Sequence, residues 1–301
     1  MNTKKNQITE IIKINMNQKK FINSISTLID STCINKYILQ IDGEIISFLF
    51  YMKRDLELNG EIYKSYSIGL VNTNNKYKGK GYGEKLMIDF KNHALKNKID
   101  ILYLQGINKY YLKFDFKRFN NKSKIKVQLL NNLIISSKIK IKKLKYEDLI
   151  KLKDLDSSII NSGNLKIKRS SDNWSELLQM QDTFLFFRPK KIIYDKELIG
   201  YFTEDIEEND LIKEFVIYKS KNYEYIREIL NLIMKSKNLI HLYVCIGRNS
   251  KLYNYIESRI DFDYIEFNRL ESSNMYCNLM QNQKISEFLS INDFILQGDN
   301  L

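Results

Sequence analysis

The chain has 301 residues, of which 44% are hydrophobic and 28% charged, and its formal net charge is +12. This length allows two medium domains or one large one. No apolar run approaches the ~18 residues of a membrane span, and the basic N-terminus lacks the apolar segment of a signal peptide. The three cysteines, Cys33, Cys245 and Cys277, are odd in number and far apart, which fits neither a disulfide framework nor a metal-ligand spacing. We therefore expect a cytoplasmic protein without a metal site.

The positive charge is concentrated in the first half of the chain. Residues 1–135 contain 23 Lys and Arg against 11 Asp and Glu, so the remaining residues are balanced. Such a surplus favours a polyanionic ligand. The sequence has no recognisable zinc finger, helix-turn-helix or RNA-binding signature. We therefore expect neither nucleic acid nor a membrane as a partner, although a nucleic-acid-associated role stays open as an alternative.

Hydrophobic periodicity in the first half predicts the order helix, three strands, helix, strand, helix, strand. Asp42-Gly43 predicts a hairpin turn between the first two strands, and Asn59-Gly60 predicts the turn before the third. An apolar stripe of Leu86, Met87 and Phe90 predicts a buried helix face. The expected elements are helices over 18–30, 83–97 and 107–113, and strands over 36–40, 44–52, 62–71, 99–105 and 124–130.

A similar order recurs beyond a possible seam at residues 131–140. Asp195-Lys196 predicts a second hairpin, within 192–202. The other expected elements are helices over 146–155, 222–236 and 249–258, and strands over 211–218, 239–246 and 275–280. Because the two halves share this plan without obvious residue identity, we predict a duplicated fold.

The segment Lys78-Gly79-Lys80-Gly81-Tyr82-Gly83 lies between the third predicted strand and the helix after it. Glycine allows positive φ and close backbone approach to a ligand, and successive amides in such a turn converge on an anion. The dipole of the following helix adds to this attraction, so the loop suits a pyrophosphate. The spacing fits neither a Walker loop nor a dinucleotide fingerprint. From the loop alone, the alternative that this segment is a glycine-rich turn that binds no ligand remains.

Two segments carry a family resemblance. Val71–Gly83 resembles motif A of the GNAT acetyltransferase superfamily, with Asn75 in place of the usual proline and Lys78 in place of the usual Arg or Gln. Tyr110–Phe116 resembles the family's Tyr-Tyr-x-Lys/Arg-Phe-Gly-Phe signature, with Asp115 at the usual glycine. Asp42–Ile46 also resembles the family's hairpin. The resemblance covers about residues 1–130, with the motifs in the family's order.

The resemblance implies an α+β (mixed αβ) fold of two GNAT-like domains, each a mostly antiparallel, splayed central sheet flanked by helices. The chain is similar to the tandem type, such as the enhanced-intracellular-survival-type acetyltransferases. It implies a GNAT N-acetyltransferase domain with the acyl-CoA site over 1–133 and a degenerate GNAT-like domain over 134–301. The second half has Tyr218–Tyr223 where a phosphate loop would lie, and this segment contains no glycine. We therefore expect the second domain to be a wall of the acceptor groove or a scaffold.

The resemblance also implies an acyl-CoA-dependent N-acetyltransferase, which transfers an acetyl group from acetyl-CoA to a primary amine of a small molecule or peptide. It places the general acid at Tyr111, with Tyr110 as the alternative if the register differs by one. No general base is evident from the residues, and the resemblance to the tandem type makes the terminal carboxylate of Leu301 one candidate. The implied cofactor-binding residues are Val71, Asn72, Thr73, Lys78, Gly79, Lys80, Gly81, Tyr82, Gly83 and Glu84.

Purely structural roles remain as alternatives for several of these residues. Tyr111 could serve only to pack against the cofactor, and we expect packing or solvated roles for His93 and His241. The loss of the motif glycine at Asp115 and the absence of a clear base favour an alternative function. The protein would then be a non-catalytic acyl-CoA sensor or an interaction protein on the same fold.

Overall fold

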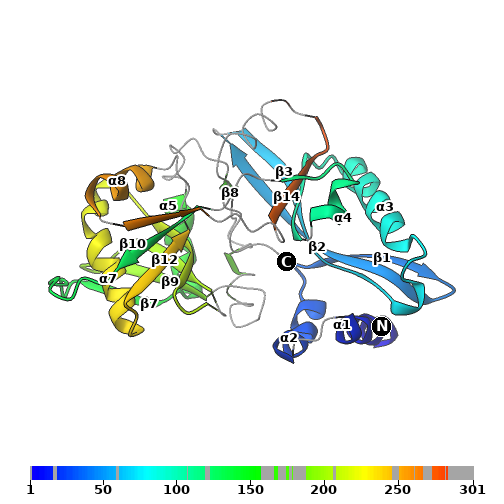
Figure 1. The fold of residues 1–301 in the computed structure, drawn as a ribbon, viewed down its shortest axis with the longest axis horizontal. Helices are drawn as coiled ribbons and strands as arrows, with labels where there is room; N and C mark the ends of the chain where they lie inside the picture. Colours follow the sequence, from blue (N-terminus) through cyan, green and yellow to red (C-terminus); the bar gives the residue numbers. More distant parts are fainter. Residues whose placement is uncertain are drawn as a thin grey trace.

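Two β-sheets form the two lobes of the molecule (Figure 1). Helices pack against both sheets, which confirms the predicted α+β class. No helix in the described part of the chain is long and apolar enough to cross a membrane. The computed structural model describes residues 2–15, 19–58, 61–106, 108–118, 123–156, 166–168, 174–175, 178, 188–205, 208–245, 251–260, 262–266, 273–281 and 283.

The first sheet is antiparallel except where β3 and β4 run parallel. Its order is β1 (Asn35–Ile41), β2 (Glu44–Leu58), β3 (Glu61–Thr73), β4 (Ile101–Gly106), β14 (Ser273–Asn278) and β5 (Lys117–Arg118), with β8 (Lys166–Lys168) paired to β2. The predicted hairpin joins β1 to β2, with φ of 48° at Asp42 and 80° at Gly43. The predicted turn at Asn59-Gly60 lies outside the described residues.

Helices cover both faces of this sheet because strand β2 is apolar on both sides. On one face, α3 (Tyr82–Lys96) buries the predicted stripe of Leu86, Met87, Phe90 and Ala94 against residues such as Leu49. On the other face lie α1 (Asn2–Asn15) and α2 (Lys19–Asp30). The apolar face of α1 meets Phe48 and Phe50 there, and it consists of Ile8, Ile11 and Ile12.

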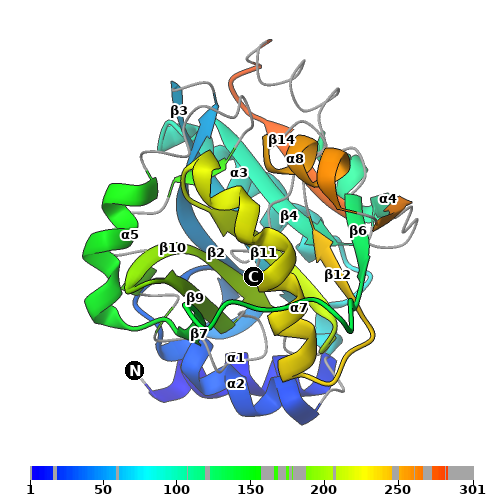
Figure 2. The ribbon, with the colours of Figure 1, turned by 90° about the vertical axis from the view of Figure 1, so that its left-hand side faces the viewer.

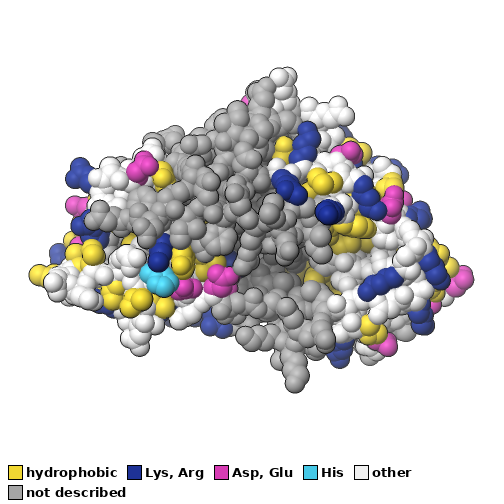
Figure 3. Space-filling model, viewed as in Figure 1, with side chains coloured by type: hydrophobic (Ala, Val, Ile, Leu, Met, Phe, Trp, Pro, Cys, Tyr) yellow, Lys and Arg dark blue, Asp and Glu magenta, His cyan; other side chains and the backbone are white. Residues whose placement is uncertain are grey.

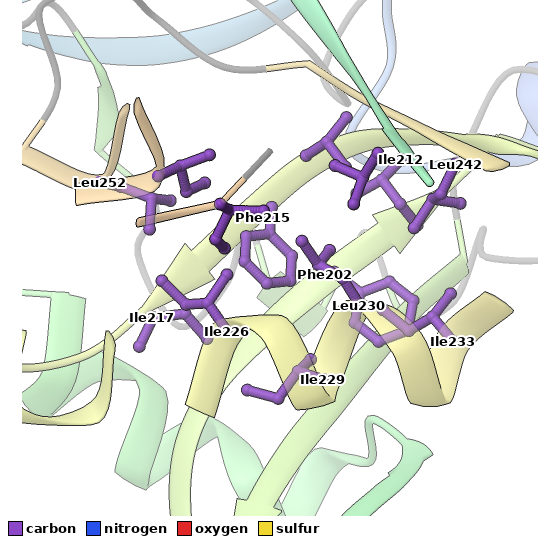
Figure 4. Packing of buried hydrophobic residues seen from close by; sticks show 14 of the residues in the cluster. Phe202, Ile212, Phe215, Ile217, Ile226, Ile229, Leu230, Ile233, Leu242 and Leu252 are labelled. Carbon is purple, nitrogen blue, oxygen red and sulfur yellow. The ribbon is translucent and has the colours of Figure 1, made fainter. Parts of the chain in front are cut away.

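The second sheet repeats this arrangement, with β11 and β12 as its parallel pair. Figure 2 shows α7 (Ile226–Ser236) lying across it, and Figure 4 shows the core between them. Ile226, Ile229, Leu230 and Ile233 form the buried face of α7, as predicted. The sheet order is β13 (Phe262–Glu266), β6 (Ser123–Gln128), β12 (His241–Cys245), β11 (Leu211–Ile217), β10 (Glu197–Glu204), β9 (Arg188–Tyr194) and β7 (Ile139–Lys143).

The two sheets exchange strands. β14, from near the end of the sequence, lies between β4 and β5 of the first sheet. β6, from the first half, lies between β12 and β13 of the second. Each half of the sequence therefore contributes its last predicted strand to the sheet of the other half, a pairing that the sequence did not predict. The division between residues 133 and 134 remains a prediction, and a cut there would remove β14 from the first sheet and β6 from the second.

A buried cluster joins the two lobes. It combines Phe48 and Phe50 of the first sheet with Leu152 of α5 (Leu149–Asp156), Trp174 and Tyr201. The rings of Trp174 and Tyr201 meet edge to face, with their centroids 5.1 Å apart. Because side chains from both halves share this core, the lobes support one another.

Most predicted elements are present with shifted ends, including α4 (Asn108–Leu112) and α8 (Lys251–Arg259). Five elements were not predicted from the sequence: α1, β5, β7, β8 and β13. Part of β7 occupies the proposed seam at 131–140. Its sequence, Ile139–Lys143, alternates apolar and basic residues as an edge strand does, but the abundance of lysine throughout the chain conceals that pattern.

Candidate active site

A bulge in β3 opens the first sheet. β3 pairs with β4 only from Ser65 to Ile68 and then continues beside β2 alone as far as Thr73. Within that extension Leu70 and Val71 together stand opposite one residue of β2, and Leu70 has a φ of 51°. A bulge bends its strand and leaves local backbone groups unpaired. The end of β3 therefore separates from β4 and presents backbone groups at the opening.

The glycine loop follows this strand end directly. Asn74 caps a short 3-10 turn, η1 (Asn75–Tyr77), by accepting a hydrogen bond from the Lys76 amide. Gly79 and Gly81 then have φ of 75° and 81°, and a Cβ built on either meets no atom within 4 Å. These two glycines are therefore needed for backbone conformation, and the space beside them is open.

Helix α3 begins at the end of this loop. The Lys85 amide donates to the Gly81 carbonyl at 3.0 Å. The preceding amides of the first turn have no intrahelical acceptor, and they lie at the positive end of the helix dipole. Loop and helix start together have the backbone geometry expected of an anion site, and binding of an anion there remains a prediction.

A cavity of about 770 Å³ lies against the loop. It is lined by every predicted cofactor-binding residue except Lys80, whose ammonium lies 5.4 Å from the centre of the Tyr77 ring. The predicted residues are thus brought to one place, and their role in binding remains a prediction. The other lining residues are Asn15, Tyr77, Tyr110, Tyr111 and Lys113.

Helix α4 places two tyrosines on the wall of this cavity. A Cβ on Gly83 would lie 2.9 Å from the Tyr110 hydroxyl oxygen and 3.2 Å from Thr73 Oγ1, so this glycine is needed for close approach. The Tyr111 ring packs between Tyr110 and Phe116, with centroid distances of 5.1 and 5.9 Å. Burial, with a smaller contribution from Tyr110, raises the pKa of Tyr111 to about 12. Tyr111 is therefore held as a neutral phenol that can donate a proton.

Asp115 keeps the turn that the family's glycine would make. Its φ is 65°, in the left-handed region that aspartate tolerates better than most residues. Lys91 Nζ lies 2.6 Å from Asp115 Oδ2 and 2.9 Å from the Phe114 carbonyl oxygen. The Lys91 ammonium thus stabilises the turn that follows α4.

Three residues at the cavity rim make contacts that were not predicted from the sequence. Asn15, the last residue of α1, bonds to the end of β3 and to Lys78. Glu84 pairs with Lys113 at 2.9 Å and so joins α3 to α4. The Tyr77 hydroxyl donates to Glu44 at 2.7 Å and holds the hairpin against η1. Each contact spans 29 residues or more, so no local pattern could have predicted it.

The corresponding turn of the second lobe is built differently. It is a 3-10 turn, η4 (Ser220–Tyr225), preceded by Lys219 with a φ of 62°. The Asn222 side chain is buried and donates to the Tyr218 carbonyl at 2.6 Å. Tyr223 packs against Tyr255 of α8 with ring centroids 5.4 Å apart. Side chains fill this turn, whereas glycines leave the first one open.

The remaining candidates lie away from the cavity wall. His93 packs among aromatic rings, with Tyr37 5.2 Å away, and His241 lies 3.4 Å from Asp210 Oδ2. Among the described residues, no group of three or more His, Cys, Asp or Glu side chains is arranged to hold a metal. Leu301 lies outside them. Figure 3 shows Lys and Arg side chains spread over the described surface of the lobe that contains α3.

The architecture resembles that of solved proteins that are built from two GNAT folds. A probable N-acyltransferase from Enterococcus faecalis aligns with a TM-score of 0.66 at 11% identity, over 92% of this chain and 71% of that one. A GCN5-related N-acetyltransferase from Kribbella flavida aligns with a TM-score of 0.65 at 9% identity, over 90% and 67%. A tandem GNAT protein from the clavulanic acid biosynthesis pathway aligns with a TM-score of 0.53 at 7% identity, over 91% of this chain and 94% of that one. These likenesses show the fold.

Residues 15–119 match the family model of the acetyltransferase (GNAT) domain. This match covers the bulge, the glycine loop and both tyrosines, and the chain as a whole has the fold of tandem GNAT proteins. No curated protein matches the sequence.

Proposed function

We propose that this protein is an N-acyltransferase that moves an acetyl group from acetyl-CoA to a primary amine of a small molecule or peptide. One observation carries the proposal. The open glycine loop, the splayed end of β3 and the neutral phenol of Tyr111 all border one cavity. An anion site, a strand edge and a proton donor are three of the features that this transfer needs, and a proton acceptor for the amine is the fourth.

The residues suit coenzyme A. Gly79 and Gly81 hold the backbone at positive φ with open space beside it, as a pyrophosphate cradle requires. Lys78 adds a cation at the same wall. The pantetheine arm contains amides, and the backbone of Val71 and Thr73 at the free edge of β3 suits strand-like pairing with them.

Bound acetyl-CoA would supply a thioester, whose carbonyl carbon is the electrophile. In the transfer, the amine nitrogen bonds to that carbon and the carbon–sulfur bond breaks. The amine loses one proton and the departing sulfur gains one. Tyr111 is suited to supply the sulfur's proton, because its raised pKa keeps it protonated. A backbone N–H at the bulge of Leu70 and Val71 is suited to stabilise the developing oxyanion.

The cavity wall also favours a second candidate, a non-catalytic acyl-CoA sensor. Among the described lining residues, Glu84 is the one carboxylate, and it is paired with Lys113. Among the described residues of this wall, no unpaired carboxylate therefore stands ready to accept the proton of the amine. A sensor would need the anion site and not the proton acceptor.

Thiol release from acetyl-CoA separates the two candidates. The purified protein is assayed with amino acids, polyamines, aminoglycosides and lysine peptides, and the free thiol of CoA is followed. We expect release above the enzyme-free rate with at least one of these classes. Binding of acetyl-CoA without thiol release for every amine would favour the sensor.

A further inference from the structure

The junction between α1 and the glycine loop depends on one side chain. Asn15 Nδ2 donates to the Thr73 carbonyl at 3.0 Å and to Asn72 Oδ1 at 3.1 Å. Its Oδ1 accepts a hydrogen bond from Lys78 Nζ at 2.7 Å. The amide therefore uses both its donor and its acceptor group, and it also lines the cavity.

These bonds act on two parts of the cavity wall. Thr73 belongs to the stretch of β3 that has left β4, so its carbonyl depends on contacts outside that pair. Lys78 is a long, flexible side chain at the start of the glycine loop, and an ammonium has three donors. Asn15 occupies one donor and leaves the others for a ligand in the cavity.

We propose that Asn15 is a positioning residue for the polyanionic part of the donor substrate, because it holds the Lys78 ammonium at the cavity wall and fixes the end of β3. This inference rests on the proposed function. It adds α1, which carries no motif, to the acyl-CoA site.

The chemistry of position 15 supports an amide there. A carboxylate would still attract Lys78, but it would face the Thr73 carbonyl and Asn72 Oδ1, which are both acceptors. It would also place a negative charge beside an anion site. Alanine would release Lys78 and the strand end together. Asparagine therefore joins the strand to the cation without adding charge.

The α1 helix offers a matched control. Gln7 Oε1 accepts a hydrogen bond from the Ile45 amide at 2.8 Å, so it also ties α1 to the first sheet. Gln7 is not among the residues that line the cavity. Gln7→Ala therefore removes a helix-to-sheet contact of the same kind without touching Lys78.

Calorimetry with three probes tests the proposal: acetyl-CoA, adenosine 3′,5′-diphosphate, and pantetheine, which lacks phosphates. We expect Asn15→Ala to weaken the binding of acetyl-CoA and of the diphosphate by about tenfold, as loss of one charge-assisted hydrogen bond predicts. The affinity for pantetheine should change by a smaller factor than the affinity for the diphosphate. Asn15→Asp should weaken the diphosphate further, and Gln7→Ala should leave all three near wild type.

A double-variant cycle completes the test. If Asn15 acts through Lys78, Asn15→Ala should have little further effect on diphosphate binding in a Lys78→Ala background. Full additivity, wild-type affinity in Asn15→Ala, or an equal loss in Gln7→Ala would overturn the proposal. If the wild-type protein binds neither acetyl-CoA nor the diphosphate, the proposed function itself fails, and the inference fails with it.

Discussion

Single residues decide whether the glycine loop can receive a ligand, and the glycines differ in their roles. Gly79 and Gly81 are required by their positive φ. Gly83 is helical and is required by its neighbours, since a Cβ would press on the Tyr110 hydroxyl. The loop therefore combines two conformational requirements with one steric requirement, and each can be tested separately.

Gly83→Ala should lower acetyl-CoA affinity while changing stability little. Alanine favours a helix by about 1 kcal/mol over glycine, and this partly offsets a contact penalty of about 1–3 kcal/mol. Relief of the contact displaces Tyr110, which lines the cavity. We expect the loss, measured by calorimetry, to shrink in a Tyr110→Phe background because the nearest atom is then gone. The same loss in both backgrounds would show that Tyr110 is not involved.

Tyr111→Phe should reduce turnover by about 100-fold or more, as expected for a lost general acid, with acetyl-CoA affinity near normal. Since burial raises the pKa of Tyr111 to about 12, its proton stays on through the usual assay range. The ratio of wild-type to variant kcat should therefore stay constant between about pH 7 and 10. If the ratio of wild-type to variant kcat already decreases as the pH approaches 10, the pKa of Tyr111 is ordinary or lowered.

The sequence predicted part of this site and missed the rest for a physical reason. The loop and Tyr111 belong to short motifs, in which local spacing carries the chemistry. Asn15 and Lys113 contribute through contacts with Lys78 and Glu84. Such contacts follow from the packing of α1 and α4, which local spacing does not encode.

At the scale of elements, the exchange of β6 and β14 is the main departure from expectation. Alternating apolar residues identify a strand and its buried face, but they do not identify its partner. The strand at 275–280 was therefore predicted, but its place in the first sheet was not. Pairing depends on which lobe offers an open position, and this is a property of the folded chain.

Met275→Ala should destabilise the lobe that contains the glycine loop, although Met275 lies in the other half of the sequence. Met275 is fully buried in the core under α3, and its loss should lower the free energy of unfolding by about 2–5 kcal/mol. Hydrogen exchange should rise in α3 more than in α7. Met280→Ala, at a side chain that is 56% exposed, is the matched control.

The reciprocal change is Val127→Ala on β6, within the second core. It should raise exchange in α7 more than in α3. If Met275→Ala raised hydrogen exchange in α7 and Val127→Ala raised it in α3, each strand would belong to the sheet of its own half. The exchange of strands between the two sheets would then be wrong.

At the scale of the whole molecule, the turn between β3 and α3 of the first lobe differs from the turn between β11 and α7 of the second. The first lobe leaves the turn open with glycines, and the second fills it with Asn222 and Tyr223. The charge surplus of the first half lies in the same part of the chain as the open turn. Both differences favour a single anion site in each chain, which remains a prediction, and the shared core joins the second lobe to the first.

Calorimetric titration with acetyl-CoA tests the central claim most directly. Gly81→Glu places a carboxylate in the proposed cradle. Gly43→Glu is its control, because Gly43 has nearly the same φ and equally open surroundings but lies outside the cavity wall. We expect one acetyl-CoA per chain for the wild-type protein and for Gly43→Glu, and none for Gly81→Glu. Two molecules per chain, undiminished binding in Gly81→Glu, or no binding to the wild-type protein at millimolar acetyl-CoA would contradict the account.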